Sequence, residues 1–139
     1  MNFQCRAAAL NDFPAMLALW QRCQEMGLMA ADTSHGFARL LERNPGLSQV
    51  AELDGELIGT ALCAHDGRRG YIYHLAVVAE HRKQGIGQAL VQQCLDGLRQ
   101  AGIVRSTVVV FASNLEGQRY WKKLGWRRRD DVVMYSRDL

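Results

Sequence analysis

The chain has 139 residues and a formal net charge of +3, with 48% hydrophobic and 22% charged residues. This length predicts a single domain, 1–139, that can bury its own core, and the composition is ordinary for a globular protein. The charge is too small to indicate a nucleic-acid partner, and no apolar run approaches the length of a membrane span. Polar residues interrupt the N-terminal run, so no signal peptide is predicted.

Cysteine usage points to a reducing compartment. Four cysteines lie far apart within strand or helix patterns: Cys5, Cys23, Cys63 and Cys94. This spacing favours buried free thiols in a cytoplasmic protein over a disulfide framework. The chain contains no Cys-x-x-Cys pair and no Cys/His cluster, so we expect no metal site.

Two helices are predicted after the opening strand at residues 3–8. Asn11 or Asp12 can cap the first, which ends at Gly27. Apolar residues repeat along it at helical spacing, and Trp20 belongs to that stripe, which favours a core role over a ligand-binding one. The second helix can be capped by Asp32, Thr33 or Ser34. It ends at the Asn-Pro-Gly sequence of residues 44–46.

A hairpin follows these helices. Strands at residues 47–53 and 56–65 are joined by Asp54-Gly55, a strong signal for a two-residue hairpin turn. The second strand is apolar on both of its faces, which predicts a sheet covered on both sides.

The most informative stretch, residues 71–98, reads as a buried strand, a cationic glycine turn and a helix. The strand covers residues 71–78 and the turn covers residues 80–87. Gly85 and Gly87 allow a bound group to approach the backbone, and the first N–H groups of a helix are unpaired and positively polarised. This predicts an anion cradle suited to a phosphate or diphosphate, although an ordinary turn with solvated basic residues has the same pattern.

The last third continues the alternation of strands and helices. An apolar strand is predicted at residues 104–112, followed by a helix that begins after Asn114 and ends at Gly125. Residues 126–130 and 132–137 predict a final pair of short strands.

Two motifs resemble a known family. The turn at residues 82–87 reads Arg-Lys-Gln-Gly-Ile-Gly and resembles the [Gln/Arg]-x-x-Gly-x-[Gly/Ala] signature of the GNAT superfamily of N-acetyltransferases. Asn114, followed by the Tyr-Trp-Lys-Lys-Leu-Gly-Trp run at residues 120–126, is similar to the family's Asn, then x-Tyr-x-x-x-Gly-aromatic. The order of elements also matches along nearly the whole chain. The resemblance implies an α/β (α+β) fold. Its mixed, mostly antiparallel sheet of six to seven strands has helices on both faces and splays between strands four and five.

The resemblance also implies a function. Backbone amides of the turn would hold the diphosphate of acetyl-CoA, the co-substrate, and the open strand would pair with its pantetheine arm. The residues so assigned to the cofactor are Leu75, Val77, Arg82, Lys83, Gln84, Gly85, Ile86, Gly87, Gln88, Asn114 and Trp121. Asn114 is equally well explained as a helix N-cap. The implied reaction is direct acetyl transfer, in a ternary complex, to a primary amine of a small molecule or a peptide. The resemblance does not identify the acceptor, and it does not decide whether the chain forms a homodimer.

The sequence departs from the family at the two positions where other members carry an acid or a base for proton transfer. Trp121 stands where many members carry an acidic Tyr, and indole does not release its proton at usable pH. Tyr120 and Tyr73 remain candidate acids, beside water or no acid at all. Val109 stands where some members carry a Glu base.

His74 is the candidate base, because histidine exchanges a proton near neutral pH. Strand alternation predicts that it shares a face with Ile72 and Ala76, where it could equally be a satisfied core histidine.

Two other classes of function compete. A dinucleotide-binding enzyme would need a third glycine after Gly87 and a second parallel strand, and the upstream hairpin fits this poorly. A non-catalytic acyl-CoA sensor or interaction domain with the same fold is compatible with the missing Tyr and Glu.

Overall fold

The computed structural model describes residues 2–23 and 26–139 in two compact parts, Met1–Val109 and Val110–Leu139, each of which is described by itself. The elements of the first part are β1 (Gln4–Ala7), η1 (Leu10–Asp12), α1 (Phe13–Gln21), α2 (Ser34–Arg43), β2 (Gln49–Leu53), β3 (Glu56–His65), β4 (Gly70–Val77), η2 (Ala79–His81), α3 (Ile86–Gln100) and β5 (Ser106–Val108). The second part contains α4 (Leu115–Lys123). A single domain over 1–139 stays a prediction.

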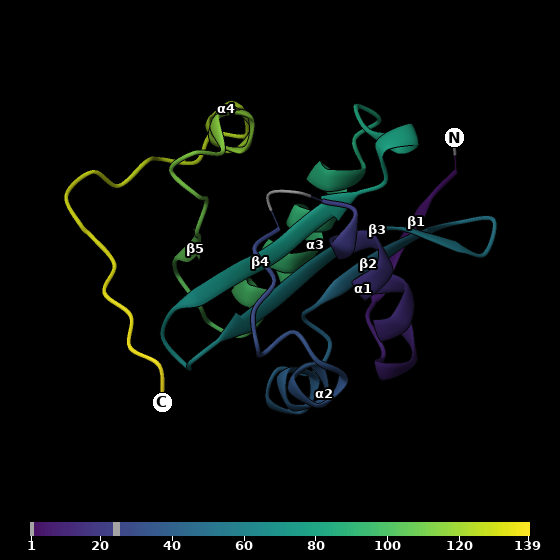
Figure 1. Cartoon of the computed structure of the whole chain (residues 1–139), viewed down its shortest axis with the longest axis horizontal. Coiled ribbons are helices and arrows are strands. Elements are labelled where there is room, and N and C mark those ends of the chain that lie inside the picture. The colour runs from purple at the N-terminus through teal and green to yellow at the C-terminus, as the bar shows by residue number, and fades with distance from the viewer. Residues whose placement is uncertain (1, 24–25) are drawn as a thin grey trace. The chain divides into compact units, whose positions relative to one another are not determined.

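The five strands form one sheet in the order β1-β2-β3-β4-β5 (Figure 1). Strands β1 to β4 pair antiparallel, and β5 pairs parallel with β4. The predicted mixed, mostly antiparallel α/β architecture is therefore confirmed, with five strands in place of the six to seven expected.

The missing strands are the predicted pair at residues 126–130 and 132–137. Over residues 126–139, all of which the structure describes, the chain forms neither strand nor helix. Arg128 and Arg129 instead pair with the carboxylates two residues ahead, Asp130 and Asp131, at 2.8 Å. An apolar alternating pattern becomes a strand only where a neighbouring strand accepts its backbone hydrogen bonds, so the pattern alone predicted too much here.

Helices cover both faces of the sheet. A Cβ on Gly59 of β3 would lie 3.0 Å from Leu90 Cδ1 of α3, whereas the hydroxyl of the next residue, Thr60, accepts the indole N–H of Trp20 from α1. Because successive strand residues point to opposite faces, α1 and α3 lie on opposite sides of β3, as Figure 1 also shows. This confirms the sheet covered on both sides.

Of the residues predicted to cap the first two helices, one does so with its side chain and another does not. Thr33, one of three candidate caps, caps α2 by accepting the N–H of Gly36 at 3.0 Å. Asp12 precedes α1 as predicted, but its carboxylate accepts the N–H of Ala9 rather than one from α1. The first helix ends at Gln21, and the part of its predicted extension at residues 24–25 lies outside the described residues.

All four cysteines are free, as predicted, and Cys63 and Cys94 are buried. A hydrogen bond with Cys63, together with burial, raises the pKa of Cys94, so this thiol stays protonated and inert. None of the described helices is both long enough and apolar enough to cross a membrane.

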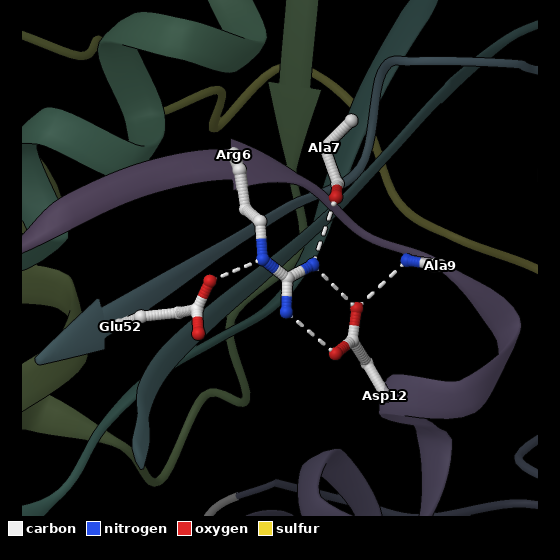
Figure 2. Close-up of polar contacts among 5 residues, drawn as sticks. All are labelled: Arg6, Ala7, Ala9, Asp12 and Glu52. Atoms are coloured by element: carbon white, nitrogen blue, oxygen red, sulfur yellow. Dashed lines mark hydrogen bonds and ion pairs between the residues drawn. The ribbon is translucent and has the colours of Figure 1, made fainter. Parts of the chain in front are cut away.

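An ionic cluster joins β1, η1 and β2 (Figure 2). The guanidinium of Arg6 donates two hydrogen bonds of 2.8 Å to the carboxylate of Asp12 and another to Glu52. Asp12 also accepts the Ala9 N–H at 2.8 Å and is only 9% exposed. The hydrogen bonds from Arg6 hold the pKa of the Asp12 carboxyl below its ordinary value.

We therefore expect Asp12→Ala to lower the free energy of unfolding at pH 7 by about 1–3 kcal/mol, because it removes two hydrogen bonds from Arg6 and leaves the Ala9 N–H without its acceptor. A carboxyl whose pKa is depressed on folding stabilises the protein above its unfolded pKa, about 3.9, and loses that contribution as pH falls through the folded value. The difference from the native protein should thus shrink in urea titrations at successively lower pH. Asp96→Ala, at an exposed ion pair, is the control and should change little. A pH-independent difference would contradict the assignment.

Candidate active site

Strand β4 has an open edge over most of its length. It pairs with β5 only through Gly70–Ile72, opposite Ser106–Val108, so residues 73–77 have no strand partner on that side among the described residues. Val78 donates its N–H to Ile58 on β3 at 2.9 Å. Backbone groups of adjacent strand residues point in opposite directions, so those of Val77, and of Leu75 two positions earlier, point to the open edge. The pairing of β4 with β5 thus ends at Ile72 and Val108, where the predicted splay would begin.

The open edge leads directly into the start of α3. Lys83 and Gly85 adopt left-handed conformations with φ of 64° and 84°, and these turn the chain into the helix. No side chain caps this helix, and its first internal bond is Ala89 N–H to Gly85 O. The N–H groups that precede Ala89 in the first turn therefore have no partner inside the helix.

The side chains around this turn divide into two kinds. Arg82, Lys83, Gln84 and Gln88 are exposed, whereas Ile86 is buried against the sheet. Of the predicted cofactor residues, Ile86 can thus contribute only its backbone N–H, while its side chain anchors the turn to the core. Arg82 Nε donates to the carbonyl of Val77 at 3.2 Å, which ties the turn to the open edge of β4.

A β-bulge lies inside the open segment. Thr60 is opposite Ala76, but Leu62 is opposite Tyr73. An advance of two residues along β3 therefore corresponds to three residues along β4, which leaves one extra residue in β4. His74 lies at this extra residue with φ of 50°, a conformation that costs a non-glycine residue about 1–3 kcal/mol.

The bulge corrects the predicted orientation of His74. Strict alternation grouped it with Ile72 and Ala76. Ala76 is opposite Thr60, which binds Trp20 of α1, but Ile72 is opposite Cys63, which contacts α3. The His74 ring instead packs against Trp20 of α1, with ring centroids 4.8 Å apart. The extra residue shifts the alternation by one position, and this turns His74 to the α1 face.

His74 is paired with a residue that sequence reasoning treated only as a helix cap. Its Nε2 lies 2.8 Å from Oδ1 of Asp32, and the two side chains are 14% and 10% exposed. The hydroxyl of Thr60 donates to the His74 carbonyl at 2.9 Å while accepting the Trp20 indole N–H at 2.9 Å. In the sequence, Asp32 was predicted only as one of three candidate caps of α2, and no pattern connected it with His74.

Tyr73 lies beside His74 and is 41% exposed. Its ring stacks on that of Tyr71, with centroids 5.9 Å apart. Partial burial raises the pKa of Tyr73, so its hydroxyl keeps its proton at neutral pH. Val109, at the end of the first part, is exposed and offers no titratable group.

The remaining predicted residues lie in the second part. Asn114 caps α4 by accepting the Gly117 N–H at 2.8 Å, which confirms its structural role. Trp121 packs edge-on against Tyr120 and Trp126. Burial raises the pKa of Tyr120. The roles of these residues toward a cofactor or substrate stay predictions.

Comparison with known proteins identifies the family. The model of the Acetyltransferase (GNAT) family matches residues 13–126. The chain belongs to this family. The prediction of a GNAT acetyltransferase, which uses acetyl-CoA, is therefore confirmed at the level of the family.

Several relatives match this GNAT chain over most of their length. An acetyltransferase of Photorhabdus laumondii is 31% identical over 137 residues, 98% of this chain and 95% of the relative. Another, of Sodalis glossinidius, is 30% identical over 129 residues, 93% and 90% of the two chains.

Solved structures share its fold. PaiA N-acetyltransferase from Thermoplasma acidophilum, in complex with coenzyme A, superposes with a TM-score of 0.80 at 16% identity, covering 95% of this chain and 94% of the other. An acetyltransferase from Clostridium acetobutylicum, solved with acetyl-CoA, has a TM-score of 0.79 at 20% identity, covering 97% and 96%.

Proposed function

We propose that this GNAT protein transfers the acetyl group of acetyl-CoA to a primary amine by direct transfer in a ternary complex. The observation that carries the proposal is the continuity of two backbone surfaces, a strand edge without a partner strand and a helix start without a side-chain cap. The open edge of β4 at residues 73–77 leads through the Arg82 contact into the uncapped first turn of α3. An extended arm that ends in a diphosphate fits both surfaces at once.

The residues of the turn fit an anionic group. The unpaired N–H groups of the first turn of α3 can donate to phosphate oxygens, and the helix dipole favours negative charge there. Exposed Arg82 and Lys83 add positive charge beside them. Leu75 and Val77 would pair through their backbones with the pantetheine amides.

We assign the proton transfer from the acceptor to His74. As the amine nitrogen bonds to the carbonyl carbon of the thioester, the C–S bond breaks and its electron pair leaves on sulfur. A backbone N–H of the open edge, near Val77, stabilises the oxygen that becomes negative during the addition. His74 takes the amine proton. The departing thiolate receives a proton from Tyr73, Tyr120 or water, or leaves as the anion.

The acceptor is a primary amine of a small molecule or a peptide. The family match spans both described parts, and this supports one acetyltransferase domain over 1–139. The absence of a Glu at Val109 and of a Tyr at Trp121 supports a second candidate function, a domain that binds acyl-CoA without turning it over.

A two-stage experiment tests the proposal. Calorimetry with acetyl-CoA measures binding, and thiol release across a panel of polyamines, amino acids, aminoglycosides and peptides measures transfer. Binding with amine-dependent thiol release supports the enzyme. Binding without release from any amine favours the sensor, and absence of binding refutes both.

A further inference from the structure

We propose that Asp32 is a positioning residue, which holds the His74 imidazole with its proton on Nε2 and leaves Nδ1 as the atom that accepts the amine proton. This inference rests on the proposed function, because it specifies how the same site moves a proton. Nothing in the sequence pattern assigns Asp32 to this role, and the contact joins residues 42 positions apart.

The two carboxylate oxygens of Asp32 have different partners, one in the loop before α2 and the other on His74. Oδ2 accepts the N–H of Met29 at 2.9 Å, which fixes the turn that precedes α2. Oδ1 lies 2.8 Å from His74 Nε2. Because Thr33 supplies the cap of α2, Asp32 is not needed for that purpose.

The imidazole is also held on its other sides. Its ring packs at 65° against Trp20, which is 1% exposed and therefore rigid. The fully buried Thr60 binds the His74 carbonyl. The bulge turns His74 toward α1, and without it the side chain would point to the α3 face, away from Asp32. The left-handed backbone conformation of His74 thus belongs to the bulge that turns its ring toward α1.

The pairing determines which ring nitrogen can act as a base. A carboxylate only accepts, so Nε2 must carry the hydrogen that lies between the two atoms, and the neutral ring then has its lone pair on Nδ1. Among the described residues Nδ1 has no hydrogen-bond partner, and the side chain of His74 is 14% exposed. Within residues 2–23 and 26–139, the charged group paired with the ring is Asp32. Its neighbours Trp20 and Thr60 do not titrate near neutral pH. The carboxylate also stabilises the imidazolium that forms when Nδ1 takes a proton.

Nitrogen NMR of the ring tests the tautomer without any acceptor. Two-bond proton–nitrogen spectra of the native chain, with His74 identified by the signals lost in His74→Gln, should show the proton on Nε2. In Asp32→Asn the amide can still accept from Met29 but donates to Nε2, so the proton should move to Nδ1. A native ring protonated on Nδ1, or a tautomer unchanged by Asp32→Asn, would overturn the inference. Because no acetyl transfer is involved, this result is separate from any failure of the proposed function.

Kinetics with an amine that the panel identifies supply the second test. Asp32→Asn should lower kcat about ten- to a hundredfold, at or below the lower end of what general base catalysis supplies. In a His74→Ala background the same change should have no further effect, because residues that act as one unit are not additive. Additive losses would show that Asp32 acts elsewhere and overturn the inference. Thr33→Ala is the control: it loosens the same loop by removing the α2 cap but should leave the tautomer and kcat unchanged.

Discussion

Replacing Gly85 with glutamate should abolish the binding of acetyl-CoA while the protein still folds. Gly85 adopts φ of 84° at the start of α3, and a Cβ placed there would meet no atom within 4 Å. The substitution therefore adds only the strain of a left-handed residue, about 1–2 kcal/mol, and no steric clash. The new carboxylate would satisfy the unpaired N–H groups itself and repel the diphosphate. Isothermal calorimetry measures the affinity, and circular dichroism on heating confirms the fold.

Two variants separate charge from strain in this experiment. Gly67→Glu introduces the same charge at φ of 94°, again with no atom within 4 Å, in the turn between β3 and β4. It should destabilise the protein comparably and leave the affinity unchanged. Gly85→Ala adds the strain without the charge and should retain most of the binding. An unaltered affinity in Gly85→Glu would refute the anion cradle.

The second large effect is expected at His74. His74→Ala should lower turnover about ten- to a hundredfold or more, because the amine must then lose its proton to water. The affinity for acetyl-CoA should not change, since the turn at α3 is untouched. Thiol release under saturating acetyl-CoA measures the rate, and calorimetry measures the affinity.

The alanine variant also leaves the carboxylate of Asp32 without its partner, which can cost about 1–3 kcal/mol of stability. His74→Gln addresses this, because its amide can donate to Asp32 but cannot take up a proton. Both variants should lose turnover to a similar extent. His35→Ala, at an exposed position on α2, is the control for loss of a histidine. Rates near those of the native protein in both His74 variants would remove His74 from the mechanism.

Local sequence chemistry predicted most elements and their order. The Asp54-Gly55 turn, the Thr33 cap and the glycine turn before α3 each act through neighbours a few residues away, so one sequence window contains the whole cause. The final strands are different. Their alternating apolar residues are visible in the window, but a strand also requires a partner edge, which the window does not contain.

The cofactor turn and the His74 pair differ in the same way. The residues predicted to bind the cofactor at the turn are contiguous, so their spacing along the chain is enough to make the prediction. The partner of His74 lies on a distant loop, and its orientation depends on one extra residue in the pairing of β4 with β3. Strand alternation assumes uniform pairing and so placed His74 on one face with both Ile72 and Ala76, which the bulge puts on opposite faces.

The amino-acid sequence by itself determined the family and the order of strands and helices as far as α4, and it predicted the turn for a diphosphate, because each is encoded in residues close together along the chain. Only the tertiary structure decided where β4 parts from β5, which face His74 occupies and that Asp32 meets it. These features depend on the register between strands and on packing across the sheet. Such contacts arise from the free energy of the whole fold, and no short stretch of sequence contains them.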